Sequence, residues 1–174
     1  MEYNFISRDT FNKIIEQYIT NLPVYKQEKS LINSDLYNII KEILLNPKNN
    51  NISNKNTHVW AKRKFKLEEI TPGDYRVLVK ESLLPVLTIE NMYEIFCRTH
   101  AEITQHGGQR QTWTSIKTKW GWIKQSIIGE LVNNCTICAV RKPSFHPLSA
   151  KPIIAKNFLS RIQVNFILFY YILY

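Results

Sequence analysis

The segment from residue 100 to residue 138, HAEITQHGGQRQTWTSIKTKWGWIKQSIIGELVNNCTIC, has two histidines near its start and two cysteines at its end. His100 and His106 are separated by five residues, and Cys135 and Cys138 by two. Two neutral imidazoles and two thiolates complete the tetrahedral shell of a structural Zn²⁺, leaving no coordination position for water. The spacing therefore predicts one zinc ion held by these four residues.

Three helical patterns surround the four predicted ligands. Large apolar side chains recur at helical spacing in residues 90–99, 109–120 and 124–134. Three short helices with so few large side chains make a thin core, so we expect zinc binding and folding to be coupled. The metal would join the exit of the first helix to the exit of the third. Of the remaining histidines and cysteines, Cys97 is expected to be a small buried hydrophobe, and His58 and His146 to lie on the surface.

The residues before the zinc segment predict helices and a small hairpin. Residues 7–45 read as two helices, each ended by a proline, Pro23 or Pro47. The asparagine-rich stretch after them predicts a linker. Residues 75–79 and 86–89 are β-type runs that we expect to pair as a hairpin, with Phe65 and Leu67 on a third strand. The fold class expected is therefore mainly α with a small β hairpin (α+β).

Charge is distributed unevenly along the 174 residues, whose formal net charge is +9. Ten of the 23 Lys and Arg residues but only two of the 14 acidic residues follow residue 97. Such asymmetry is typical of a segment that faces a polyanion, most often nucleic acid, and equally of a solvated basic surface that serves solubility. A hydrophobic content of 44% excludes wholesale disorder.

Cysteine usage and the chain's apolar runs bear on location. Three cysteines are too few for a secreted disulfide scaffold, and residues 1–4 lack the features of a signal peptide. The longest apolar run, residues 166–174, is far shorter than the ~20 residues that span a bilayer. We therefore expect an intracellular protein, neither secreted nor associated with a membrane.

Four short motifs resemble the His-His-Cys-Cys zinc-binding domain of retroviral and gypsy-type retrotransposon integrases. They are His100-x5-His106-Gly107-Gly108, Gln111-Thr112-Trp113, Trp120-Gly121-Trp122-Ile123, and Cys135-Thr136-Ile137-Cys138 with Arg141-Lys142 after it. Ile123 stands where that family usually has proline. The resemblance to this family covers residues 59–168. Over residues 59–161 the chain more closely resembles integrase-derived host-type proteins, the KRAB-A domain-containing protein 2-like proteins.

The resemblance extends past the zinc domain. In that family an RNase H-like core comes next, and three of its carboxylates hold two metal ions. Residues 162–167 resemble the opening strand of that core, with Asn165 at the position of its first catalytic aspartate. An amide does not supply the charge that Mg²⁺ requires, and no acidic residue occurs after Cys138. We therefore expect a chain that is not an enzyme.

The function that the resemblance implies is a zinc-binding, nucleic-acid-binding and assembly module of a transposon-derived integrase. DNA is the expected partner, with homo-oligomers formed through the zinc domain, a nuclear location and no small-molecule substrate. Two alternatives stay open: a protein-interaction module without a DNA role, and the N-terminal fragment of a full DNA integrase. The basic side chains expected at phosphates, on and around a helix-turn-helix, are Arg110, Lys117, Lys119, Lys124, Arg141 and Lys142.

These expectations divide the chain into six segments. They are a helical N-terminal region (1–47), an Asn-rich linker (48–58), a strand-rich extension (59–89), a zinc-stapled three-helix domain resembling a helix-turn-helix (90–142), a basic linker (143–161) and a truncated first strand of an RNase H-like core (162–174).

Overall fold

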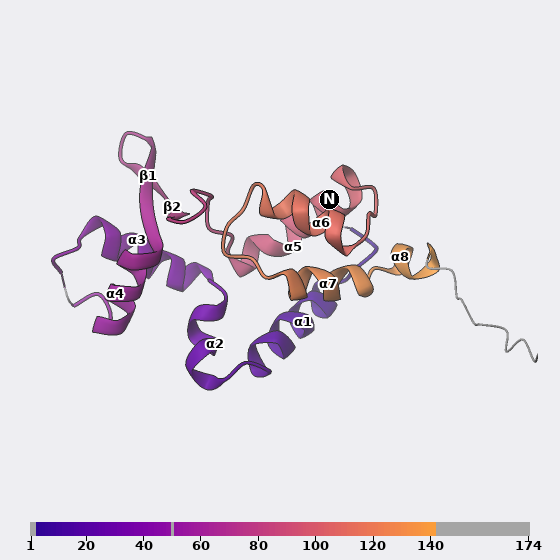
Figure 1. Cartoon of the computed structure of the whole chain (residues 1–174), viewed down its shortest axis with the longest axis horizontal. Helices are drawn as coiled ribbons and strands as arrows, with labels where there is room; N and C mark the ends of the chain where they lie inside the picture. Colours follow the sequence, from indigo (N-terminus) through magenta and orange to yellow (C-terminus); the bar gives the residue numbers. More distant parts are fainter. Residues whose placement is uncertain (1–2, 50, 142–174) are drawn as a thin grey trace, which may run out of the picture. The chain divides into compact units, whose positions relative to one another are not determined.

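The computed structural model describes residues 3–49 and 51–141, which fall within one compact unit (Figure 1). The described part contains eight α-helices, one π-helical turn and a single two-stranded antiparallel sheet, which confirms the predicted α+β class. Lys142, the predicted basic linker and the predicted strand containing Asn165 lie outside the described residues. None of the described helices is long and apolar enough to cross a membrane.

The N-terminal region has three helices where the sequence predicted two. They are α1 (Arg8–Thr20), α2 (Val24–Ser30) and α3 (Ser34–Leu45). The side chain of Ser7 accepts a hydrogen bond from the Thr10 amide and so caps α1. Pro23, which was expected only to stop the first helix, occupies the N-cap position of α2. The prediction was wrong here because a proline suits the start of a helix as well as the residues after one.

Helix α4 (Lys55–Lys64) begins inside the predicted linker. The side chain of Asn54 accepts a hydrogen bond from the Thr57 amide at 2.8 Å, so an asparagine of the linker caps this helix. His58, predicted to lie on the surface, is buried at 5% exposure. The linker is therefore a loop that ends in a helix cap, shorter than the predicted residues 48–58.

The hairpin pairs different strands from those predicted. Strand β1 (Phe65–Thr71) pairs with β2 (Asp74–Val79), with Phe65 opposite Val79. Of the expected partner of β2, residues 86–89, only the first residue stays next to that strand. Leu78 and Pro85 form an isolated antiparallel bridge, and the Val86 amide donates to the Val77 carbonyl at 3.0 Å. The amide of Leu87 bonds instead to the carbonyl of Gly121 at 3.1 Å, so the pairing with β2 ends after Val86.

The three helices predicted around the zinc ligands are present. They are α5 (Ile89–Arg98), α6 (Gln109–Lys117) and α7 (Gln125–Asn133). A π-helical turn, η1 (Thr99–Ile103), extends α5, and the short α8 (Thr136–Arg141) follows α7. The sequence patterns predicted neither of these two additions.

Two hydrophobic clusters hold the described residues together. The first joins α1 to α5, α6 and α7, and it includes Phe5, Phe96 and Leu131. The second joins α3 and α4 to the hairpin, around Ile40 and Phe65. Because α1 and the residues before it belong to the same cluster as the zinc segment, the predicted boundary at residues 48–58 does not separate two compact units.

Candidate metal centre

The four predicted ligands come together at the ends of helices. His100 lies in η1 directly after α5, and His106 lies in the loop before α6. Cys135 connects α7 to α8, and Cys138 lies on α8. One ligand atom from each residue lies within 4.8 Å of the others, so this group could hold a metal ion. The exit of the first predicted helix thus meets the exit of the third, as the sequence indicated.

Two of the distances between ligand atoms are close to the edge lengths of a tetrahedral shell. Sγ of Cys138 lies 3.2 Å from Nε2 of His100, and Sγ of Cys135 lies 3.4 Å from Nδ1 of His106. Metal bonds of about 2.0–2.3 Å require edges of about 3.3–3.8 Å in a tetrahedron. The Cys138 amide also donates a hydrogen bond to the Cys135 sulfur at 3.5 Å.

A hydrogen-bond chain fixes the orientation of the His100 ring. Nδ1 of His100 lies 3.1 Å from the hydroxyl oxygen of Thr112, and this hydroxyl donates to the carbonyl of Gly107 at 3.2 Å. Because the Thr112 proton is engaged with the carbonyl, its oxygen accepts from the Nδ1–H group. The lone pair then resides on Nε2, the nitrogen beside Cys138.

Aromatic rings enclose both imidazoles. Phe96 stacks on His100 with ring centroids 5.2 Å apart, and Phe5 meets His106 edge-on at 4.9 Å. Burial, with a smaller effect of the neighbouring His106, lowers the pKa of His100 to about 4. Burial and then the charge of Arg141 lower the pKa of His106. Both rings are therefore neutral near pH 7, the state in which imidazole binds metal.

The loop carrying His106 has a constrained backbone. Gln105 and His106 have φ angles of 49° and 59°, a region that residues other than glycine rarely occupy. A Cβ on the next residue, Gly107, would collide with the Gln111 side chain and lie 3.0 Å from the Thr104 carbonyl. Glycine at 107 therefore lets the loop pass this close to Thr104 and Gln111 without displacing either.

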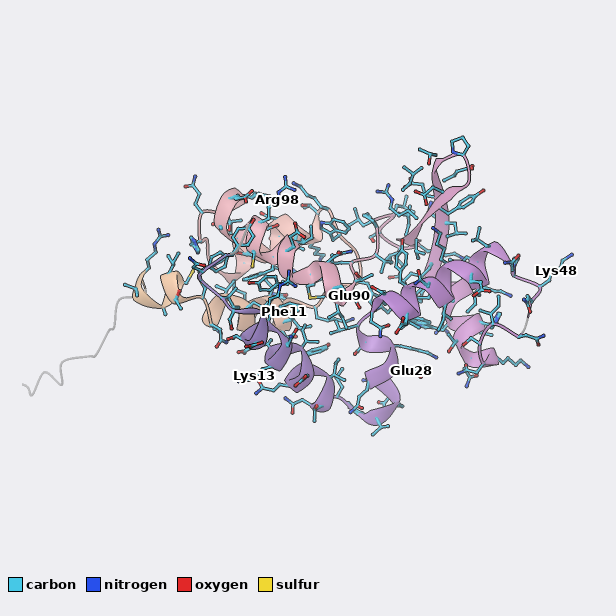
Figure 2. All side chains as sticks on the ribbon, turned by 180° about the vertical axis from the view of Figure 1, so that it is seen from behind. Phe11, Lys13, Glu28, Lys48, Glu90 and Arg98 are labelled. Carbon is cyan, nitrogen blue, oxygen red and sulfur yellow. The ribbon has the colours of Figure 1, made fainter. Side chains whose placement is uncertain are left out.

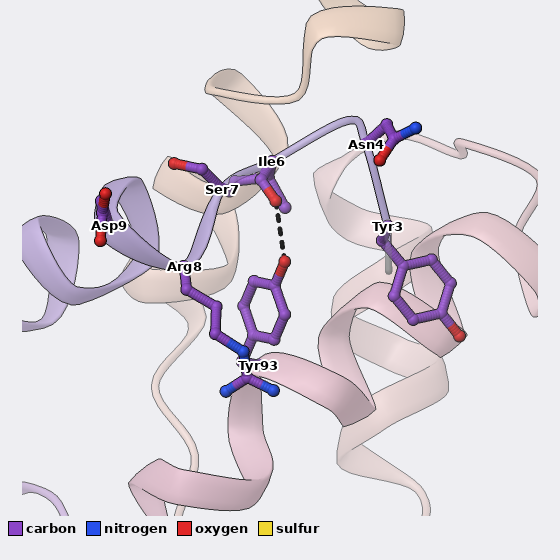
Figure 3. A pocket seen from close by; sticks show the side chains of 7 residues that line it. All are labelled: Tyr3, Asn4, Ile6, Ser7, Arg8, Asp9 and Tyr93. Carbon is purple, nitrogen blue, oxygen red and sulfur yellow. Dashed lines mark hydrogen bonds between the residues drawn. The ribbon is translucent and has the colours of Figure 1, made fainter. Parts of the chain in front are cut away.

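The N-terminal segment closes over the centre, which the sequence patterns did not reveal. The carbonyl of Phe5 accepts hydrogen bonds from the amide and the hydroxyl of Thr136 at 3.0 and 3.3 Å. Tyr93 donates its hydroxyl to the Ile6 carbonyl at 2.9 Å, and the Arg8 guanidinium lies over the Tyr93 ring (Figure 3). The one local signal was the pair of apolar residues directly before the N-cap Ser7, the position of a hydrophobic staple.

Cys97 is fully buried in the core and is not in the group of potential ligands found among the described residues, as predicted. Burial raises the pKa of its thiol to about 11.

The basic residues predicted to contact nucleic acid differ in their surroundings. Arg110, Lys117 and Lys119 are exposed and form no ion pair with any described residue. Lys124 is half-buried, with its ammonium group 5.3 Å from the Trp122 ring. Arg141 donates to the carbonyl of Gln105 at 3.3 Å, so it lies against the loop that carries His106.

Comparison with known proteins adds no relative: no family model, no curated protein and no solved structure matches the chain. The interpretation of the centre therefore rests on its own residues and geometry.

Proposed function

We propose that His100, His106, Cys135 and Cys138 bind one structural Zn²⁺. The proposal is carried by one observation, the convergence of four ligand atoms within 4.8 Å. Two sulfurs and two imidazole nitrogens form a donor set typical of zinc. With four protein ligands the metal has no position for water or substrate, so its role is to hold α5, α6 and α8 together.

Removal of the metal tests this role. The full-length protein should retain about one zinc per chain after dialysis, and chelation should lower its helical circular dichroism. A Cys97→Ala variant is the matched control, since it removes a buried thiol that is not a ligand. Helicity that stays unchanged after complete removal of the metal would refute the structural role.

We further propose that the zinc-stabilised domain binds nucleic acid. The support is electrostatic: no acidic residue occurs between Glu102 and Glu130, and the exposed cations on and after α6 have no described carboxylate partner. Cations of this kind bind phosphates without reading the base sequence.

The helix pair α6 and α7 resembles a helix-turn-helix. The proposal also includes a role in the assembly of a transposon-derived integrase in the nucleus. It includes no catalytic role, because the position that resembles the first catalytic aspartate of the integrase family is Asn165, an amide.

Charge reversal tests the nucleic-acid proposal. The variant Arg110→Glu/Lys117→Glu/Lys119→Glu should lose duplex DNA binding and keep its zinc. A control with the same charge change, Lys13→Glu/Lys48→Glu/Lys55→Glu, uses exposed lysines outside the zinc segment and should bind much as the parent does. With three to five phosphate contacts, log affinity should fall against log salt with a slope of about −3 to −4.5.

Equal binding by the first variant and the parent would refute this role for α6. The alternative, a protein-interaction module whose basic charge is incidental, would then replace it.

A further inference from the structure

A second group of cations lies in a cavity of about 280 Å³ lined by residues of α1, α2 and the start of α7. Tyr18, Tyr25, Lys26, Lys29 and Lys124 are among the lining residues. The cavity is therefore lined by three lysines, which come from two segments nearly a hundred residues apart in sequence. None of the residues that line it is acidic.

The three ammonium groups lack carboxylate partners among the described residues. The acidic residue nearest to them on α2, Glu28 (labelled in Figure 2), does not line the cavity. Each ammonium group lies instead near an aromatic ring. The distances are 5.5 Å from Lys26 to Tyr25, 5.4 Å from Lys29 to Trp60 and 5.3 Å from Lys124 to Trp122. Cation–π contacts offset only part of the cost of gathering three positive charges.

Lys124 is the most confined of the three lysines. It occupies the N-cap position of α7, and the Trp122 ring beside it contacts Trp60 at 5.7 Å, edge-on. Burial lowers the pKa of the Lys124 ammonium group, because less water remains to solvate its charge. An anion in the cavity would pair with the Lys124 ammonium group and so offset the loss of its hydration.

We propose that this cavity binds a phosphate group, and that its occupant is a backbone phosphate of the nucleic acid that α6 contacts. The inference rests on the proposed function. Three ammonium groups without described carboxylate partners form charge-assisted hydrogen bonds with a phosphate group. Two observations favour a nucleic acid as its source. Two tyrosine rings line the same hollow, a combination typical of nucleic-acid surfaces, and Lys124 begins the helix that comes after α6.

The first test measures how DNA binding by the full-length protein depends on salt. Lys26→Gln/Lys29→Gln should reduce the slope of log affinity against log salt by about 0.9, since the cavity holds one phosphate and each phosphate contact contributes about that much. The matched control is Lys13→Gln/Lys48→Gln, which removes the same charge. Lys13 lies on α1 and Lys48 on the loop after α3, and neither lines the cavity (Figure 2). This control should keep the slope of the parent.

The second test uses inorganic pyrophosphate alone and monitors the indole NMR signals of Trp60 and Trp122. Both signals should shift in a saturable way in the parent and in the α6 charge-reversal variant. They should not shift in Lys26→Gln/Lys29→Gln. Zinc content and circular dichroism should match the parent in every variant, so a loss of response reflects the cavity rather than the fold.

The outcomes separate this inference from the proposed function. If the parent binds DNA and Lys26→Gln/Lys29→Gln keeps the control's slope, the inference is overturned while the function stands. If the parent binds no DNA, the proposed function fails and so does the nucleic-acid source of the phosphate. A pyrophosphate response that depends on Lys26 and Lys29 would then support a site for a free phosphate compound. No pyrophosphate response in the parent would overturn the phosphate site itself.

Discussion

Nδ1 of His100 lies 3.1 Å from the Thr112 hydroxyl, while Nε2 of the same ring lies 3.2 Å from Sγ of Cys138. The two nitrogens of one imidazole thus have separate partners, one on α6 and one on α8. This arrangement connects the helix proposed to contact nucleic acid directly to the metal centre. The relationship gives Thr112 a positioning role that can be measured.

Replacing Thr112 by valine should weaken zinc binding without removing a ligand. Valine has nearly the shape of threonine but cannot accept the Nδ1–H bond, so the ring loses the partner that orients it. Loss of such an outer partner typically lowers metal affinity 10–100-fold. Competition against a chromogenic chelator measures the change. Thr112→Ser, which keeps the hydroxyl, should restore most of the affinity, and a valine variant with the parent's affinity would refute the positioning role.

Phe5 should contribute to the stability of the centre although it lies 95 residues from the first ligand. Its ring is 5% exposed and contacts both imidazoles, at 5.7 Å from His100 and 4.9 Å from His106. Phe5→Ala should lower the free energy of unfolding by about 3–5 kcal/mol, measured by urea titration with zinc present. Val24→Ala, at an 83% exposed position, is the control and should change it by less than about 0.5 kcal/mol. Similar effects of the two substitutions would show that the N-terminal segment does not close over the centre.

Cys97 should be unreactive in the folded protein. Its thiol is buried and burial raises its pKa to about 11, so almost none of it is thiolate at neutral pH. Iodoacetamide near neutral pH should leave Cys97 unmodified until the protein is unfolded, as read by mass spectrometry of peptides. Cys97→Ala should leave the zinc content unchanged, whereas Cys138→Ala should abolish tight zinc binding. Fast alkylation of Cys97 in the zinc-loaded protein would contradict its placement in the core.

Acid should release the metal and destabilise the fold. In the folded chain the His100 ring, whose pKa is lowered from 6.5 to about 4, stays neutral until the pH approaches 4. The unfolded ring gains its proton near its ordinary pKa of 6.5, so the unfolded state binds more protons between these values. The contribution of the neutral His100 ring to the free energy of unfolding is therefore complete above pH 6.5, and it is lost as the pH falls toward 4. Zinc release, measured with a fluorescent indicator, should increase as the pH falls, because protons compete with zinc for the imidazole nitrogen. A zinc affinity that does not change with pH would contradict the assignment of His100 as a ligand.

The sequence predicted the parts of the site that depend on local spacing. The Cys-x2-Cys pair and the two histidines identified the group that converges, and helical periodicity located α5, α6 and α7 to within a few residues. Thr112 was visible within a quoted motif, but its role depends on a hydrogen bond between α6 and η1. Spacing alone gives no information on such a contact.

The parts that the sequence did not predict depend on distant residues. Phe5 reaches the centre only because α1 packs on α7, and no local pattern encodes that packing. Strand pairing was predicted only in part because the Leu87 amide bonds to the carbonyl of Gly121, a contact with a residue distant in sequence. Of the cavity lysines only Lys124 was predicted to contact phosphate, because Lys26 and Lys29 lie in the nearly neutral half of the chain, far from it in sequence. Charge counts along the chain do not report charges that meet in space.

Zinc K-edge X-ray absorption on the full-length protein is the most direct test of the central claim, that these four residues form a closed zinc site. The account predicts about one zinc per chain with two sulfur ligands near 2.3 Å and two nitrogen ligands near 2.0–2.1 Å. Cys135→Ser should lower the sulfur count to one or lose the metal, and Cys97→Ala should leave the spectrum unchanged. A spectrum with only oxygen and nitrogen ligands, or a purified protein that holds no zinc, would contradict the account.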